Sequence, residues 1–329
     1  FTAILTTKAI NGPLLSKDLL GLWGIIKMMG LVLITQSVLQ FFNTYLSSWI
    51  GQNIIKELRI RLLYDHEIHT LDILDGQDLR DCDLDYDVDV IFHLAAVLGV
   101  DIVADNPVET MDVEVIGTRN VVEASETNNV KYILYASTSG IYSHSAIVKN
   151  ALTEEVLVDP RTSYAMAKRY NEIYLASHHE ERGINVISIR FFNVYGWNQD
   201  NRMVVPRFFE QCEDGEDITV FGSGEQTRDF TYIDDIVKGV VSTLIENSKD
   251  KSLYKLYNIG NSSPVKLMDF INSIEKITGI KVEKEMLPMQ AGDVNQTWAD
   301  VSQLQKDYDY KSSTSVDSGI EAFVNWYKS

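Results

Sequence analysis

Short apolar runs alternate with helix-like segments along most of the chain after residue 66. Residues 88–96, 131–135 and 185–190 have the nearly continuous hydrophobic pattern of strands buried on both faces. Residues 118–124 and 163–178 have helical spacing. Because strands that alternate with helices usually form one parallel sheet, the pattern predicts an α/β fold with a doubly wound sheet.

Residues 1–66 follow a different pattern. No charged residue occurs from Met28 to Ile55, a run longer than the ~20 residues that span a bilayer. Several Gln and Asn residues dilute its hydrophobicity, so a membrane contact through residues 19–55 and an amphipathic helical extension are both open. Residues 45–64 resemble a stretch of the membrane domain of ABC-type exporters. We therefore expect an atypical helical N-terminal segment that is a candidate for membrane association.

Charge and cysteine content narrow the class of protein. The 329-residue chain has a net charge of −18, which argues against nucleic acid as a partner because phosphates require clustered Lys and Arg. Cys82 and Cys212 are its only cysteines, so we expect no disulfide framework and a cytoplasmic location. The histidines show no metal-site spacing, and no metal is predicted.

Tyr164 and Lys168 are the most informative pair. Four residues are about one helical turn, so the two side chains share a helix face. A cation beside a phenol favours the phenolate, and this predicts a lowered tyrosine pKa and an acid/base role. Ser137 and Thr138 end a predicted strand and offer hydroxyls that could complete a proton relay.

Several motifs occur in a fixed order. They are Asp72-Ile73, Phe92-His-Leu-Ala-Ala96, Ser137-Thr-Ser139, Tyr164-x-x-x-Lys168, Arg190-Phe-Phe-Asn-Val-Tyr-Gly196 and Gln226-Thr-Arg-Asp-Phe-Thr-Tyr-Ile-Asp-Asp235. In this order they resemble the extended short-chain dehydrogenase/reductase family, and within it the NAD-dependent nucleotide-sugar epimerases and dehydratases. The resemblance implies a Rossmann-like NAD-binding and catalytic domain at 67–195 and a smaller C-terminal lobe, mainly for the nucleotide sugar, at 196–329.

The resemblance also implies roles for individual residues. Tyr164 would be the acid/base, Lys168 would tune it and hold the nicotinamide ribose, and Thr138 would bind the reacting hydroxyl. The other NAD contacts would be Asp72, Ile73, Leu94, Ala95, Ala96, Ser137 and Phe192. The nucleotide sugar would contact Thr138, Asn193, Arg228 and Asp293. A homodimer is implied as well.

Departures from the family pattern favour one reaction. Relatives that remove water from the sugar place an Asp-Glu pair after the catalytic Thr, and decarboxylating relatives place a Glu at the second of these positions. Ser139 and Gly140 stand there and cannot transfer protons in that role. Gln290 replaces a phosphate-binding Arg, and with Met289 it resembles the UDP-glucuronate 4-epimerases. The expected reaction is epimerisation of a UDP-hexose or UDP-hexuronate at C4, with dehydration or decarboxylation as the alternative.

Two further departures concern NAD binding and the helix near residue 117. The family opens with a strand, a glycine-rich loop and an acidic residue, and residues 1–66 contain no such series. The alternative is therefore a non-catalytic protein that binds a nucleotide sugar and has a membrane-anchoring N-terminus. Glu114 replaces an Asn usually found before Gly117-Thr118.

Overall fold

The computed structural model describes residues 78–80, 88–97, 99–147, 150–199, 203–247, 253–289 and 293–328. The chain divides into two compact units, Phe1–Glu67 and Ile68–Ser329. The expected helical segment 1–66, the candidate membrane contact 19–55, Gln290, and the predicted adenine contacts Asp72 and Ile73 lie outside the described residues. The described residues all belong to the second unit.

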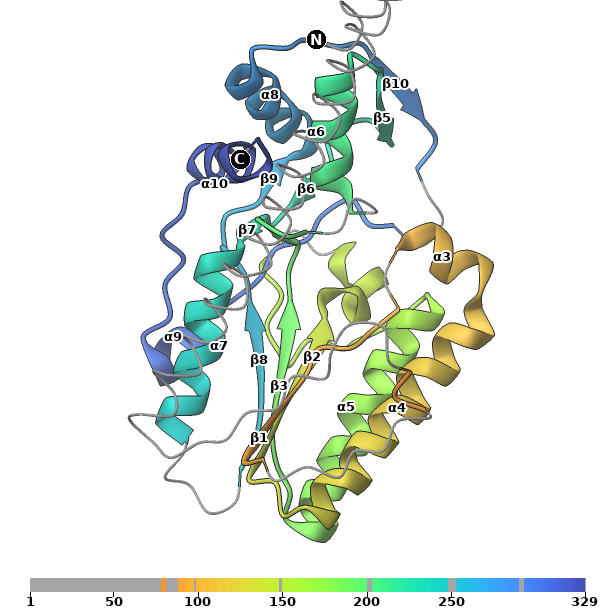
Figure 1. The fold of residues 1–329 in the computed structure, drawn as a ribbon, viewed down its shortest axis with the longest axis vertical. Helices are drawn as coiled ribbons and strands as arrows, with labels where there is room; N and C mark the ends of the chain where they lie inside the picture. Colours follow the sequence, from red (N-terminus) through yellow and green to blue (C-terminus); the bar gives the residue numbers. More distant parts are fainter. Residues whose placement is uncertain are drawn as a thin grey trace, which may run out of the picture. The chain divides into compact units, whose positions relative to one another are not determined.

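A four-stranded parallel sheet forms the centre of this unit (Figure 1). Its order is β1 (Val90–His93), β2 (Tyr132–Thr138), β3 (Asn185–Phe191) and β8 (Tyr254–Ile259). The first three strands lie within or overlap the predicted apolar runs. Their side chains are largely buried, and Leu134 of β2 and Ile187 of β3 are fully covered. The predicted α/β fold with a parallel sheet is confirmed.

Two long helices pack together on one face of the sheet (Figure 1). α4 (Pro107–Thr127) follows the short α3 (Val100–Asp105), and α5 (Ser163–Arg182) precedes β3. The Thr162 hydroxyl accepts a hydrogen bond from the Ala165 N–H and caps the start of α5, while Gly183 ends it in the left-handed conformation at φ 77°. These caps fix the helix on which the predicted acid/base pair lies.

The opposite face of the sheet is covered by α7 (Ile233–Asn247) and α9 (Ser302–Tyr308) (Figure 1). Both helices, and β8, come from the part of the chain assigned by sequence to the smaller lobe. The boundary at residue 196 therefore does not separate the sheet domain from the smaller lobe completely, because the chain returns to the sheet after this residue. The returning strand β8 pairs with β3 and buries Tyr257 and Ile259.

The smaller lobe has its own apolar core. It is built from α6 (Val204–Asp214), α8 (Leu267–Thr278), α10 (Val316–Tyr327) and the parallel pair β5 (Ile218–Phe221) and β10 (Lys284–Leu287). Short strand pairs complete this part of the unit: β4 (Val194–Tyr195) with β7 (Thr231–Tyr232), and β6 (Thr227–Arg228) with β9 (Val265–Lys266). Phe209, Phe270 and Phe323 are fully or almost fully buried, so the lobe is packed independently of the main sheet.

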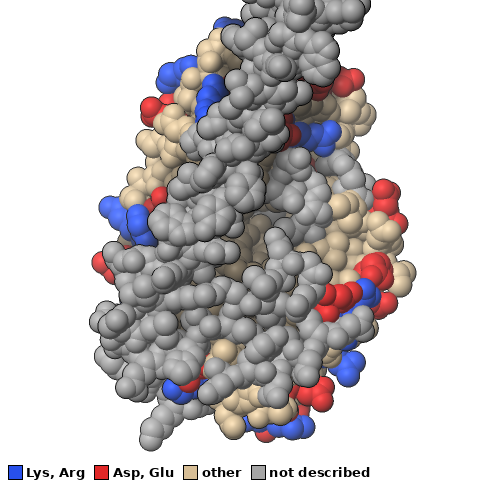
Figure 2. All heavy atoms as spheres, viewed as in Figure 1, with Lys and Arg blue, Asp and Glu red and all other residues tan. Residues whose placement is uncertain are grey.

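Figure 2 shows Lys and Arg side chains interspersed with Asp and Glu around the described residues visible on that face. In the portion of the chain that the structure describes, no helix combines the length and the apolar character needed to cross a membrane.

Candidate functional site

Tyr164, Lys168 and Thr138 lie together where β2 ends beside the first turns of α5. The Thr138 side chain lies beside the Tyr164 hydroxyl, near enough to act on the pKa of Tyr164 and lower it. Lys168 Nζ lies 5.5 Å from the centroid of the Tyr164 ring. The Thr138 hydroxyl also accepts a hydrogen bond from the Gly140 N–H at 3.1 Å, in the turn that begins η2 (Ser139–Ile147). The structure thus brings together all three residues predicted to be catalytic.

Lys168 is buried and has an acidic partner. Its Nζ lies 3.0 Å from Glu114 Oε2, and each of the two side chains is only 1% exposed. The ammonium is also 5.0 Å from the centroid of the Tyr135 ring. Glu114 Oε1 accepts a hydrogen bond from the Val97 N–H at 2.9 Å. One carboxylate therefore connects the catalytic helix with the segment that follows β1.

Burial and charge act in opposite directions on Tyr164. Burial raises the pKa of Tyr164 above its ordinary value, Lys168 acts to lower it, and Glu114 acts to raise it. The prediction of a lowered pKa is therefore wrong for the protein without ligands, because burial outweighs the ammonium. Burial disfavours the charged form of Lys168, but Tyr135, Tyr164 and Glu114 more than compensate and raise its pKa. Lys168 is consequently a cation at neutral pH.

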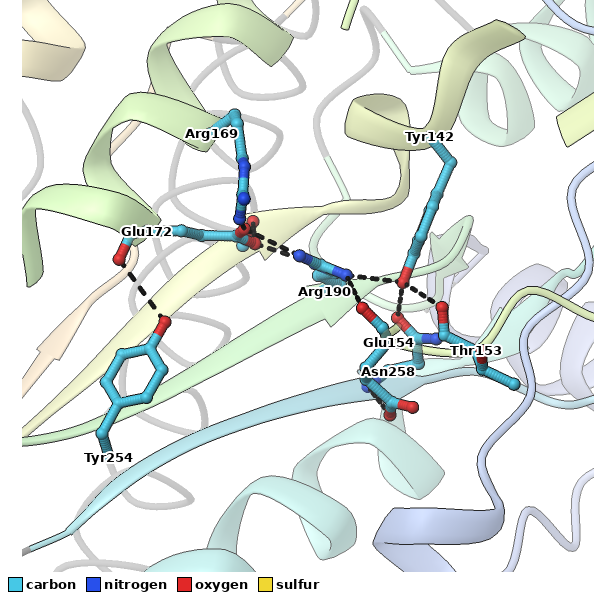
Figure 3. A network of polar contacts seen from close by, with 9 residues as sticks. Tyr142, Thr153, Glu154, Arg169, Glu172, Arg190, Tyr254 and Asn258 are labelled. Carbon is cyan, nitrogen blue, oxygen red and sulfur yellow. Dashed lines mark hydrogen bonds and ion pairs between the residues drawn. The ribbon is translucent and has the colours of Figure 1, made fainter. Parts of the chain in front are cut away.

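Ser137 belongs to a buried polar network next to this site. It is 3% exposed and donates a hydrogen bond to Glu172 Oε1 at 2.6 Å. Glu172 accepts two hydrogen bonds from Arg190, each of 2.9 Å, and one from Arg169 (Figure 3). The Ser137 hydroxyl is thus used inside the protein, and its predicted contact with NAD stays a prediction.

Arg190 extends this network to η2, to the loop that contains Glu154, and to β8. It donates hydrogen bonds to the Tyr142 hydroxyl at 2.7 Å and to the Glu154 carbonyl at 3.1 Å (Figure 3). Tyr142 in turn donates to Asn258 Oδ1 at 2.8 Å. The sequence placed Arg190 in a motif but assigned no role to it, and it did not single out Tyr142, Glu154 or Asn258. A charged residue at the end of the buried strand 185–190 was the available signal, because a buried guanidinium requires acceptors.

The segment after β1 presents a small apolar surface. Leu94 is 57% exposed and Ala95 is also exposed, whereas Ala96 is partly covered. This segment continues from the carboxyl end of a parallel strand, the edge at which such sheets bind ligands. Exposed small side chains there fit the close approach of a dinucleotide. Lys168 Nζ forms an ion pair with Glu114 but no hydrogen bond within the described residues. Because an ammonium has three N–H donors, Lys168 could donate to ribose hydroxyls.

Phe192 and Asn193 follow β3. Phe192 is fully buried in a small apolar cluster, with its ring centroid 6.0 Å from that of Tyr142. Asn193 adopts a positive φ of 32°, and its Oδ1 accepts a hydrogen bond from the Thr297 hydroxyl at 2.6 Å. The Asn193 carbonyl accepts from the Thr231 N–H. Both residues are held firmly, and their contacts with nicotinamide and diphosphate stay predictions.

Arg228 and Asp293 form an ion pair. One terminal nitrogen of Arg228 donates to both carboxylate oxygens of Asp293, at 2.7 and 2.8 Å. Burial lowers the pKa of Arg228, and Asp293 acts against that shift. The two residues predicted to bind the nucleotide sugar therefore contact each other. Among the described residues, no group of three or more His, Cys, Asp or Glu could hold a metal ion.

Comparisons with known proteins match this chain to one family. The model of the NAD dependent epimerase/dehydratase family matches residues 49–260 and so begins inside the segment 1–66 that the sequence sets apart. An uncharacterised protein of Methanocaldococcus jannaschii is 37% identical over 83% of each chain. A UDP-glucuronate 4-epimerase of Thermodesulfobacterium geofontis is 32% identical, covering 80% of this chain and 79% of its own.

Solved structures show the same fold. The UDP-glucuronic acid 4-epimerase of Bacillus cereus in complex with UDP-glucuronic acid and NAD superposes with a TM-score of 0.72 at 29% identity, over 83% of this chain and 87% of that one. The UDP-glucose 4-epimerase of Thermotoga maritima with UDP-glucose gives 0.70 at 26% identity, over 77% and 83%. The expected resemblance is confirmed: this chain belongs to the family of NAD-dependent epimerases and dehydratases, with its Rossmann-like α/β fold.

Proposed function

We propose that this chain epimerises a UDP-hexuronate or UDP-hexose at C4 of the sugar. The observation that carries the proposal is the arrangement of Thr138, Tyr164 and Lys168 at the end of β2. A phenol that lies beside a threonine hydroxyl and a buried ammonium can exchange a proton with a secondary hydroxyl. UDP-glucuronate is the preferred candidate substrate, because UDP-glucuronate 4-epimerases are similar to this chain over most of its length.

In this mechanism the Thr138 hydroxyl orients the C4 hydroxyl and the Tyr164 phenolate accepts its proton. Lys168 stabilises the phenolate by its charge. When bound, NAD supplies the acceptor and later the donor of the C4 hydride, so it is not consumed. Tyr164 returns the proton after the 4-keto sugar has turned over. Lys168, Leu94 and Ala95 would contribute to holding the dinucleotide.

The diphosphate of the substrate would be held by Arg228. Its planar guanidinium suits phosphate oxygens, and it already binds two oxygens of Asp293. A bound diphosphate would compete with Asp293 for the same donors. Asp293 would then be free to contact another part of the nucleotide sugar.

We also propose that the protein is a homodimer through α5 and α4. Met166, Tyr170 and Ile173 lie on one face of α5 and are 45%, 43% and 55% exposed. Ile116 of the neighbouring α4 is 37% exposed. An apolar stripe on two adjoining helices fits a second copy of the same helix pair, because a two-fold interface joins identical surfaces.

The direct test is an assay of the purified chain with NAD and UDP-glucuronate. Proton NMR of the anomeric signals should show conversion to UDP-galacturonate, and the same equilibrium mixture should form from either epimer. Absorbance at 340 nm should not rise steadily, because the cofactor is regenerated. No conversion of UDP-glucuronate or UDP-glucose would contradict the proposal, and release of carbon dioxide would favour the decarboxylase alternative.

A further inference from the structure

Glu114 has contacts that the proposed reaction does not by itself require. It is on the inner face of α4, is 3% exposed, and lies 54 positions before Lys168 in the sequence. Of its two carboxylate oxygens, Oε2 lies 3.0 Å from Lys168 Nζ and Oε1 accepts the Val97 N–H at 2.9 Å. Burial of a carboxylate is costly in free energy unless the carboxylate is paired. Both oxygens of Glu114 have such partners.

Hydrogen bonds join the two helices around Glu114. The Asn171 amide nitrogen of α5 lies 3.0 Å from the Glu114 carbonyl, 2.9 Å from the Thr118 hydroxyl and 3.0 Å from the Tyr135 hydroxyl, and its two N–H groups can donate to two of these oxygens at a time. Thr118 also contacts the His93 ring at 2.8 Å. This network fixes α4 against α5 and against the ends of β1 and β2. The distance between Glu114 and Lys168 is therefore set by the fold.

We propose that Glu114 is a positioning residue that supplies a built-in counter-ion to Lys168 and thereby offsets the stabilisation that Lys168 gives to the Tyr164 phenolate. The role of Glu114 as counter-ion is independent of the proposed function, and only its effect on the reaction rate rests on that function. At this position the chain has a negative charge 3.0 Å from the ammonium of Lys168, and this charge offsets that of the lysine. Glu114 also fixes the backbone of Val97, so the same side chain ties the segment after β1 to the acid/base pair.

The other titratable groups around the pair do not compete for this role. His93 of β1 is buried, and burial, assisted by Lys168, lowers its pKa to about 3, so it is neutral. Burial raises the pKa of Tyr135 of β2, so that phenol stays protonated. Among the described residues, Lys168 and Glu114 are thus the charges that act on Tyr164, and they act in opposite directions.

Spectroscopic titration of the purified chain tests the proposal without a functional assay. Tyrosine ionisation is followed by ultraviolet difference absorbance, and the signal of Tyr164 is the difference between the unmodified chain and Tyr164→Phe. In Glu114→Gln the amide keeps an acceptor for Val97 but removes the charge, so the midpoint of the Tyr164 titration should move to lower pH. Glu114→Asp, which keeps the charge, should restore the midpoint toward that of the unmodified chain.

The matched control is Glu123→Gln, which removes an exposed carboxylate from the same helix. It should leave the Tyr164 titration unchanged. A Glu114→Gln midpoint equal to that of the unmodified chain would overturn the proposal. If Glu114→Gln does not fold, a crystal structure of the unmodified chain is the test instead. A Glu114 carboxylate that does not contact Lys168 would overturn the proposal, and a contact near 3.0 Å would support it.

Activity data then separate the two proposals. If the unmodified chain epimerises no UDP-sugar, the proposed function fails, while the titration still reports on Glu114. If the chain is active, the acid limb of the kcat profile of Glu114→Gln should move to lower pH together with the titration. An unmoved kcat profile beside a moved titration would show that Glu114 does not govern the reacting group, and would overturn the catalytic part of the inference.

Discussion

Arg190 and Glu172 form a fork-to-fork pair beneath the candidate site. Arg190 Nε lies 2.9 Å from Glu172 Oε1, and a terminal nitrogen of Arg190 lies 2.9 Å from Oε2. The two side chains are 1% and 0% exposed. Because Ser137 donates to the same carboxylate, the pair connects β3 and α5 with the end of β2 that carries Thr138.

This pair should be essential for stability when only one partner is removed. Glu172→Gln leaves the guanidinium without its counter-ion, and the free energy of unfolding should fall by roughly 3–5 kcal/mol. Replacement of both residues, Glu172→Gln with Arg190→Met, should cost less than the sum of the single substitutions. Urea unfolding followed by circular dichroism measures all three. Strict additivity would show that the pair is not coupled, and the exposed Lys266→Gln should change the unfolding free energy little.

The same pair predicts a loss of stability in acid. Burial acts to raise the pKa of Glu172, but hydrogen bonds from Arg190, Ser137 and Arg169 prevail and lower it below the ordinary 4.5. A depressed pKa in the folded state gives stability that is complete above the unfolded value and is lost as the pH falls through the folded value. Thermal unfolding between pH 6 and pH 3 should therefore show a steeper loss in the unmodified chain than in the double variant.

The sequence pattern predicted β1, β2, β3 and α5 well but not α4. The predicted helix 118–124 is only the second half of α4, which begins at Pro107. The inner face of its first half buries Thr110, Glu114 and Gly117 instead of large apolar residues, so the hydrophobic period is weak there. The strand β8 was also missed, since its polar positions interrupt the apolar run that marks β2 and β3.

The sequence predicted the residues at the centre of the candidate site, Tyr164 and Lys168, but it did not predict which charged residues form ion pairs there. Tyr164 and Lys168 share a helix, so their proximity follows from spacing alone. Glu114 with Lys168, and Arg228 with Asp293, are separated by 54 and 65 positions, and only the fold brings them together. The sign of the pKa change at Tyr164 was predicted wrongly for the same reason, since burial is a property of the packed structure.

Tyr164→Phe should abolish epimerisation while preserving the fold. The substitution removes the hydroxyl that lies beside Thr138 but keeps the ring next to Lys168. Loss of an acid/base group lowers kcat by about 10²- to 10⁴-fold. The measurement is the initial rate of epimer formation by NMR, with thermal unfolding as the control for folding. Full activity of this variant would remove Tyr164 from the mechanism.

Lys168→Met should move the acid limb of the pH profile of kcat to higher pH. Lys168 acts to lower the pKa of Tyr164, so its removal leaves burial and Glu114, which both raise it. Less phenolate is then present at any given pH, and kcat should fall most at low pH. A profile of kcat between pH 6 and pH 10 checks this. A uniform loss at every pH would indicate that Lys168 acts through binding alone.

Arg228→Gln should weaken substrate binding more than catalysis. Hydrogen bonds to charged groups contribute about 1.5–3 kcal/mol, so the dissociation constant for UDP should rise roughly 10- to 150-fold. Isothermal calorimetry with UDP and with the UDP-sugar measures this effect. Asp293→Asn is the matched variant, because it frees the guanidinium from its partner. Unchanged affinity for UDP in Arg228→Gln would leave Arg228 as the partner of Asp293 only.

Ile173→Glu should disrupt the proposed dimer. Ile173 is 55% exposed on the outer face of α5, seven positions after Met166 and three after Tyr170, so a charge there would be buried without a partner in a symmetric interface. Sedimentation equilibrium should show a dimer for the unmodified chain and a monomer for this variant at the same concentration. Met286→Glu, at a 48% exposed position on β10 of the smaller lobe, is the matched control and should remain dimeric. A monomeric unmodified chain, or a dimeric Ile173→Glu variant, would contradict an interface built on α5.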